Sequence, residues 1–226
     1  MHGTKSPASK EKLDECTNQY KIFDYYIYAR IAKLIAKPVL KTNLTPNLIT
    51  LISLFFGVLA GFFFLLGNYY YTVLGVIFMQ LVQVFDTVDG AVARFKKIST
   101  PFGGFFDFSV NMITAYIAIF TISLGMFLKT SNPTVLIISI FAVGNFLMMH
   151  MLKNSFYLKV PSIKQANEYQ VSKKLCIGGA DTFTFLILIC GLFNQLFLLL
   201  VVLAVGSGAI WIKRIFSYYK ISKVVE

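Results

Sequence analysis

Long apolar runs limit most strongly what this chain can fold into. Each run approaches the length of about 20 residues that a helix needs to cross a bilayer. The composition agrees, because 57% of the 226 residues are hydrophobic and 14% are charged, whereas about a quarter of a soluble domain is charged. The sequence therefore predicts an all-α fold, a bundle of six transmembrane helices over residues 46–66, 71–95, 103–128, 133–153, 180–194 and 196–213.

The chain before the first apolar run divides into two parts. Residues 1–19 are polar and predict a lead-in, whereas residues 20–42 contain a segment too short and too charged to span a bilayer. Its pattern predicts an amphipathic helix along the membrane surface. The apolar face would carry Ile22, Tyr25, Tyr26, Ala29, Ala32 and Ile35, flanked by Lys21, Arg30, Lys33 and Lys37. Residues 43–226 then form the six-helix membrane domain.

Basic residues predict how the bundle is oriented. Of the 21 Lys and Arg residues, Lys129 alone falls in the short loops that join helices one and two, three and four, or five and six. Because positive charge stays on the cytosolic side of a membrane, both termini and residues 153–179 are expected to face the cytosol. The net charge of +11 is thus explained by topology and by attraction to membrane lipids, and no nucleic-acid partner is expected.

Acidic side chains occur where two predicted helices approach each other at the cytosolic end. One face of the second helix carries Asp86, Asp89, Gly90 and Ala93, at the spacing i, i+3, i+4 and i+7. One face of the third helix carries Gly103, Asp107 and Asn111, spaced four apart. Residues at these spacings share a helical face, and a short turn joins the helices, so both faces can close on one cleft.

Three carboxylates at membrane depth require a partner, because each costs on the order of 2.5–3.5 kcal/mol in a membrane helix. Carboxylate oxygens are hard ligands that suit Mg²⁺, Mn²⁺ or Ca²⁺. Gly90 and Ala93 leave the acidic face without bulk, so that a phosphorylated group could approach the backbone. The residues alone therefore predict a cytosol-facing, metal-dependent phosphate or pyrophosphate site.

Two other interpretations fit part of this pattern. Asp86 and Asp89 could pair with Arg94 or Lys96 and stabilise the helix ends, although this leaves Asp107 and the glycines unexplained. A cation channel or transporter would also keep acids in membrane helices, but transporter sites typically lie near the bilayer midplane, whereas these acids lie near one surface.

The stretch resembles the signature of the CDP-alcohol phosphotransferase family, D-x2-D-G-x2-A-R-x8-G-x3-D-x3-D. Seven of the eight specified positions match at the correct spacing: Asp86, Asp89, Gly90, Ala93, Arg94, Gly103 and Asp107. The segment "TPNLIT" at 45–50 is similar to the start of the family's first helix. Membrane prenyltransferases also use acidic helices and Mg²⁺, but they have two separate motifs and more helices.

The resemblance implies an enzyme of phospholipid biosynthesis. Family members transfer a phosphoryl-linked group from a CDP-alcohol to an acceptor hydroxyl and release CMP, using Mg²⁺ or Mn²⁺; we expect two ions and a homodimer. By position, Asp86, Asp89 and Asp107 would bind metal, together with Asn111. The nucleotide and pyrophosphate would contact these aspartates and Asn47, Gly90, Ala93, Arg94 and Gly103.

Asn111 departs from the family, whose last aspartate is the general base or a metal ligand. An amide is not a useful base, although its carbonyl oxygen could still contact a metal. Asn111 therefore suggests an inactivated form. It is either a deliberate replacement that preserves shape or a natural loss or change of activity; the intact remainder of the motif favours the replacement.

The substrates are only partly predicted. The expected donor is CDP-diacylglycerol or a related CDP-lipid, with a small polar acceptor alcohol; transfer of choline or ethanolamine to diacylglycerol is the alternative. Lys153 and Arg214 are candidates for binding an acceptor phosphate, and Asp181 for binding an acceptor hydroxyl or capping its helix. His150 is expected to be a hydrogen-bonded core residue.

Overall fold

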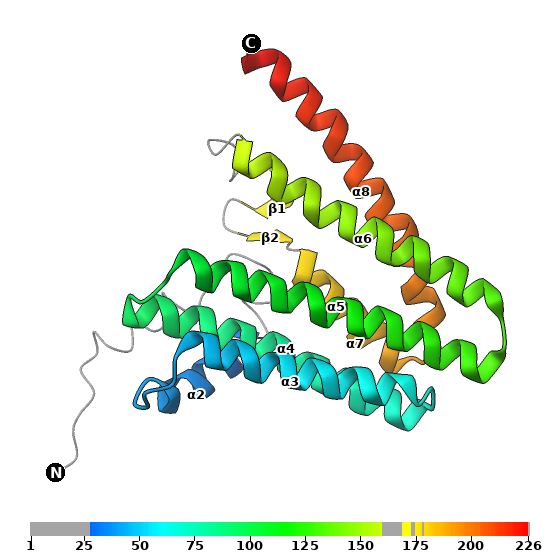
Figure 1. Cartoon of the computed structure of the whole chain (residues 1–226), viewed down its shortest axis with the longest axis horizontal. Coiled ribbons are helices and arrows are strands. Elements are labelled where there is room, and N and C mark those ends of the chain that lie inside the picture. The colour runs from blue at the N-terminus through cyan, green and yellow to red at the C-terminus, as the bar shows by residue number, and fades with distance from the viewer. Residues whose placement is uncertain (1–27, 160–168, 173–174, 178, 226) are drawn as a thin grey trace.

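The computed structural model describes residues 28–159, 169–172, 175–177 and 179–225. It confirms the predicted all-α class (Figure 1). The helices are α2 (Ala29–Val39), α3 (Pro46–Leu65), α4 (Tyr69–Lys96), α5 (Pro101–Thr130), α6 (Pro133–Lys159), α7 (Gly179–Leu192) and α8 (Leu196–Val225). Between α6 and α7 lies an antiparallel pair of short strands that the sequence did not predict, β1 (Tyr169–Ser172) and β2 (Leu175–Ile177).

Five helices in the described residues are long and apolar enough to cross a membrane: α3, α4, α5, α6 up to Leu152, and α8 up to Tyr219. The predicted span 180–194 is also an apolar helix, α7, but it has 14 residues, fewer than the roughly 20 of a full crossing. It is followed by a turn in which Asn194 takes a left-handed conformation with a φ of 55°. The chain is a multi-pass integral membrane protein.

The starts of α3 and α5 lie at one end of the bundle, together with the end of α4 (Figure 1). Thr45 caps α3, because its Oγ1 accepts a hydrogen bond of 3.4 Å from the Leu48 N–H, and Pro46 follows in the first turn. Thr100 and Pro101 repeat this arrangement in α5, where Thr100 Oγ1 accepts from the Gly103 N–H at 3.0 Å. Proline suits this position because no helical partner exists for its missing N–H.

Helix α2 packs on the side of α4. Its small residues Ala29, Ala32 and Ala36 are buried, and Ala32 and Ala36 belong to a cluster with Val84, Val88 and Val92. The Tyr28 hydroxyl donates to Gln80 Oε1 at 2.6 Å. The bulky side chains of Ile31 and Leu34 are instead exposed. The alanine face therefore contacts α4, because small residues let two helices approach closely; Ile22, Tyr25 and Tyr26 lie outside the described residues.

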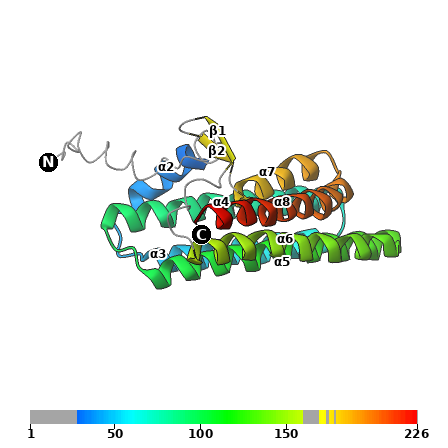
Figure 2. The same ribbon diagram turned by 90° about the horizontal axis from the view of Figure 1, so that it is seen from above.

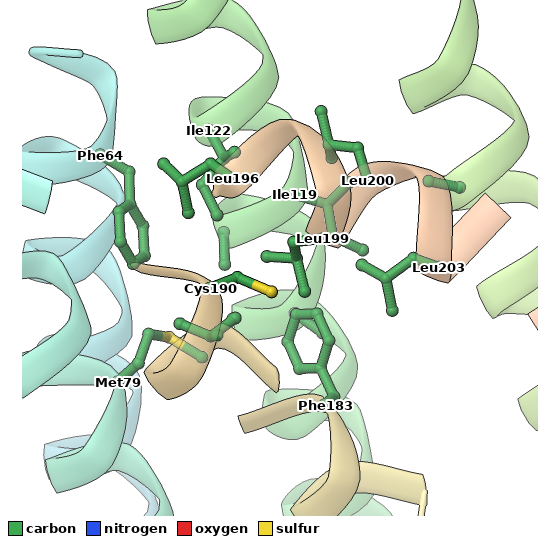
Figure 3. Packing of buried hydrophobic residues seen from close by; sticks show 14 of the residues in the cluster. Phe64, Met79, Ile119, Ile122, Phe183, Cys190, Leu196, Leu199, Leu200 and Leu203 are labelled. Carbon is green, nitrogen blue, oxygen red and sulfur yellow. The ribbon is translucent and has the colours of Figure 1, made fainter. Parts of the chain in front are cut away.

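The main core forms where the later helices meet the earlier ones. Figure 3 shows Phe183 and Cys190 of α7 and Leu196, Leu199, Leu200 and Leu203 of α8 beside Ile119 and Ile122 of α5. Phe64 of α3 and Met79 of α4 close the same cluster. Seen from above, α5 and α6 lie in one layer and α4, α7 and α8 in the other (Figure 2).

Helices α3 and α5 approach closely at two glycines, which form a G-x-x-x-G pattern in "GVLAG" at 57–61. A Cβ atom at Gly57 would overlap Thr114 Cγ2, and one at Gly61 would overlap Ile117 Cγ2. This spacing of small residues is a known device for close helix packing in membranes. It fixes α5, which carries Asp107 and Asn111, against α3.

We expect Gly57→Ala to lower the free energy of unfolding by about 1–3 kcal/mol, because overpacking a close helix contact forces the backbones apart. Thermal unfolding in detergent would measure the change. Gly144→Ala on α6 is the matched control, since no atom lies within 4 Å of its added Cβ. Equal unfolding midpoints for the two variants would contradict the close α3–α5 contact.

Candidate active site

A cavity of about 290 Å³ lies at the end of the bundle where α3 and α5 begin and α4 ends. Three consecutive helices and one turn form its wall. The lining residues are Pro46, Asn47 and Thr50 of α3; Asp89, Gly90, Ala93 and Arg94 of α4; Ile98, Ser99 and Thr100 of the turn; and Gly103, Gly104 and Asp107 of α5. The cavity therefore brings together residues that the sequence motif predicted and several that it did not.

Asp89 is the most buried of the predicted acids, with 5% of its surface exposed. Its Oδ2 accepts a hydrogen bond of 2.6 Å from the Thr50 hydroxyl, which also lines the cavity. A hydrogen bond to a charged group stabilises more than one between neutral groups. Sequence reasoning missed Thr50, although it lies one turn beyond Pro46 in "TPNLIT", on the side of α3 that carries Asn47.

Asp86 and Asp107 are brought together by the residue that departs from the family motif. The Asn111 side-chain Nδ2 donates to Asp86 Oδ1 at 2.5 Å and to Asp107 Oδ1 at 2.9 Å. The predicted convergence of the α4 and α5 faces is therefore present in the structure. The Asn111 amide nitrogen is the point on which the two carboxylates converge.

The small residues of the motif also have a local role. A Cβ at Gly90 would lie 3.1 Å from Arg94 Nη1, so the Arg94 guanidinium extends over Gly90 beside the cavity. A Cβ at Gly103 would lie 3.1 Å from Thr100 Oγ1 and 3.4 Å from Asn47 Oδ1. Asn47 thus lies beside Gly103, across the cavity from the acidic face of α4.

The family model for CDP-alcohol phosphatidyltransferases matches residues 43–219, which is most of the chain. The chain belongs to this family.

Two relatives by sequence match part of the chain. An uncharacterized protein of Aquifex aeolicus (strain VF5) is 41% identical over 71 residues, which are 31% of this chain and 35% of that protein. The archaetidylinositol phosphate synthase of Pyrococcus horikoshii (strain ATCC 700860) is 32% identical over 91 residues, which are 40% of this chain and 47% of that protein. The aligned region thus covers less than half the length of each relative.

Solved structures of the phosphatidylinositol phosphate synthase of Mycobacterium tuberculosis share the fold. The structure with CDP-DAG bound has a TM-score of 0.64 at 18% identity and covers 83% of this chain and 92% of that one. The structure in complex with manganese and citrate has a TM-score of 0.66 at 16% identity and covers 83% and 88%. Both likenesses concern the fold of the family.

A divalent ion, which this family implies, fits the side chains present by charge and by donor type. The carboxylates of Asp86 and Asp107 converge on one atom, Asp89 lies one turn further along α4, and all three supply hard oxygens. Within the described part of the chain, no group of three Asp, Glu, His or Cys side chains is placed to hold an ion by itself. Magnesium sites of this kind typically use one or two carboxylates, several waters and substrate phosphates.

Lys96 does not supply the ion pair that was considered for the acidic residues. Its Nζ donates to the Thr42 carbonyl at 3.0 Å and to the Leu44 carbonyl at 3.2 Å. Lys96 therefore fixes the segment between α2 and α3 to the end of α4. These bonds go to backbone carbonyls and not to Asp86 or Asp89.

The candidate acceptor residues are not part of the described cavity. Arg214 Nη1 donates to the Met149 carbonyl of α6 at 2.5 Å. The side chains of Lys153 and Asp181 lie outside the described residues. His150 is hydrogen-bonded as predicted, since its Nδ1 is 3.0 Å from the Phe146 carbonyl oxygen, but it is half-buried and packs its ring on Phe146.

Proposed function

We propose that the chain is built to transfer a phosphoryl-linked group from a CDP-alcohol to the hydroxyl of an acceptor alcohol, with release of CMP, in phospholipid biosynthesis. One observation carries the proposal. Asp89, Asp107, Gly90 and Arg94 line a single cavity at the end of the bundle, and Asp86 is joined to Asp107 through Asn111 at its edge.

Asp86, Asp89 and Asp107 would hold Mg²⁺ or Mn²⁺, because their carboxylate oxygens suit these metals, and Asn111 lies between two of these carboxylates. The similar phosphatidylinositol phosphate synthase of Mycobacterium tuberculosis has been solved in complex with manganese. Divalent metal bound at a pyrophosphate stabilises the negative charge on the departing phosphate. Thr50 orients Asp89 for this task, because its hydroxyl donates to Asp89 Oδ2 and leaves Oδ1 outside that bond.

The nucleotide and pyrophosphate would lie over the small residues of the cavity wall. Gly90, Ala93 and Gly103 leave room for a phosphate to approach the helix backbones, and Arg94 supplies a guanidinium at the same wall. A guanidinium binds phosphate oxygens through paired hydrogen bonds. Asn47, beside Gly103, can contact the base or the ribose through its side-chain amide.

In the reaction, the acceptor oxygen would form a bond to the phosphorus that carries the alcohol, and the bond from that phosphorus to the CMP oxygen would break. The acceptor proton must move to a base near Asp86 and Asp107. The contacts of position 111 with both carboxylates support that role for an acidic residue there, but an amide does not accept the proton. We infer that the form with Asn111 binds its substrates and turns over slowly.

The donor that we favour is CDP-diacylglycerol or a related CDP-lipid, because a membrane-embedded site can receive a lipid tail from the side. A phosphorylated inositol is the first acceptor to test, since similar proteins are named as synthases of archaetidylinositol phosphate and phosphatidylinositol phosphate. The distribution of Lys and Arg supports a cytosolic location for both termini and the cavity, because positive charge stays on that side. A homodimer is part of the proposal and rests on family membership.

Equilibrium binding of labelled CDP-diacylglycerol to the full chain in detergent tests the proposal. We expect binding with Mn²⁺ that is lost in EDTA and displaced by excess CDP. Failure of CDP-choline and CDP-ethanolamine to displace the lipid would support a CDP-lipid donor, and preferential binding of either one would favour the aminoalcohol alternative. Absence of any metal-dependent binding would overturn the proposed function.

A further inference from the structure

Asn111 does more in this structure than lack a proton acceptor. Its side-chain NH₂ group has two hydrogens, and both are used on carboxylates, one on Asp86 Oδ1 and one on Asp107 Oδ1. The amide therefore presents its partially positive end to two negative groups on different helices. The Asn111 carbonyl oxygen is correspondingly directed away from the point where those groups converge.

The repulsion between the Asp86 and Asp107 carboxylates must be offset where they converge. Two carboxylates that converge within a membrane domain repel each other more strongly than in water, because the local dielectric constant is low. A divalent ion would relieve the repulsion by binding both. The Asn111 amide relieves it by two charge-assisted hydrogen bonds, at 2.5 and 2.9 Å.

An ion between the same two oxygens would compete with this amide. Both hydrogen bonds would have to break, and the amide would have to rotate so that its carbonyl oxygen faced the metal. An aspartate at position 111 would have the opposite effect, because it would add a third carboxylate without a donor, next to Asp86 and Asp107. The arrangement would then depend on cations for its stability.

We propose that the Asn111 side-chain amide takes the place of one divalent ion, so that this chain assembles its acidic site without that ion and binds one ion fewer than its Asn111→Asp variant. This inference rests on the proposed function, because it assumes that the site binds divalent metal at all. It makes Asn111 a positioning residue that keeps the α4 and α5 acidic faces together in the absence of metal.

The test compares the full chain with Asn111→Asp, both purified in detergent and stripped with EDTA. Bound Mn²⁺ per chain is measured by equilibrium dialysis and elemental analysis, and the unfolding midpoint is measured with and without Mn²⁺. We expect about one ion for the chain with asparagine and about two for the aspartate variant, as in two-metal sites. In EDTA, the aspartate variant should unfold at the lower temperature.

Adding Mn²⁺ at 100 times its Kd should raise the midpoint of the aspartate variant by on the order of 5–10 °C more than that of the chain with asparagine. Two further variants separate the causes. Asn111→Leu should lose stability in EDTA, because leucine supplies no hydrogen-bond donor to Asp86 and Asp107. Asn68→Asp, at an exposed helix start where the side chain makes no capping bond, should behave as the unchanged chain.

Equal ion counts in the two forms, or equal midpoints in EDTA, would overturn the inference while leaving metal-dependent CDP-lipid binding intact. Absence of Mn²⁺ binding in both forms would overturn the proposed function and the inference together. These results are therefore distinguishable from each other.

Discussion

Asn111→Asp should raise the rate of CMP release by about 10²- to 10⁴-fold, the usual contribution of a positioned general base. The expected increase follows from the location of the side chain at position 111. Position 111 contacts both Asp86 and Asp107 at the edge of the cavity, and an aspartate there can take the proton of an attacking hydroxyl. Neighbouring carboxylates favour this role, because like charges raise the proton affinity of a carboxylate.

The measurement is CMP release from CDP-diacylglycerol with Mg²⁺ or Mn²⁺ and a panel of acceptor alcohols that includes inositol phosphate, glycerol phosphate and serine. Asn111→Glu is the matched control, because it restores the charge but displaces it by one methylene. A low rate with the glutamate and a high rate with the aspartate would identify a positioned base. Equal rates for the asparagine and aspartate forms would contradict the assignment of position 111.

Asp89→Asn should reduce metal-dependent binding of a CDP-linked ligand by more than about 100-fold. Altering a residue that only supports a metal ligand typically costs about 10- to 100-fold in metal affinity, and Asp89 is itself a proposed ligand. Asp89 is buried, lines the cavity and is oriented by Thr50. The substitution keeps the size of the side chain and can still accept the Thr50 hydrogen bond. It removes only the negative charge that a cation requires.

Binding of labelled CDP-diacylglycerol in Mn²⁺ measures the effect, and CMP release in the Asn111→Asp background gives a second readout. Thr50→Val is the informative comparison, because it keeps the Asp89 charge but removes the hydroxyl that orients it. We expect it to weaken binding less than Asp89→Asn does. Unchanged binding in Asp89→Asn would remove Asp89 from the proposed metal ligands.

The sequence predicted the helices well because a bilayer imposes a length and a composition on each of them. It also predicted which residues meet, since Asp86 and Asp107 lie on adjoining helix faces at fixed spacings. It predicted family membership from seven matching positions, and the family model confirms it. All of these features depend on residues that are near in sequence or repeat with the helical period.

Features that depend on packing between distant segments were not predicted. The contact between Thr50 and Asp89 joins two helices across 39 positions, and a single threonine in an apolar helix carries no signal of its partner. The end of α7 was predicted at residue 194 and lies at Leu192, because its apolar run continues through Phe193 into the turn. The burial of Ala29, Ala32 and Ala36 against α4 was missed because alanine fits a lipid-facing surface and a close helix contact equally well.

The cavity is lined by residues between Pro46 and Asp107, all from α3, α4, α5 and the turn before α5. The later helices α6 and α8, which lie side by side (Figure 1), contribute none of its described lining. If the proposed function holds, the nucleotide would contact only the first half of the chain. Substitutions in α6 and α8 could then change the acceptor alcohol without altering the residues that bind the nucleotide.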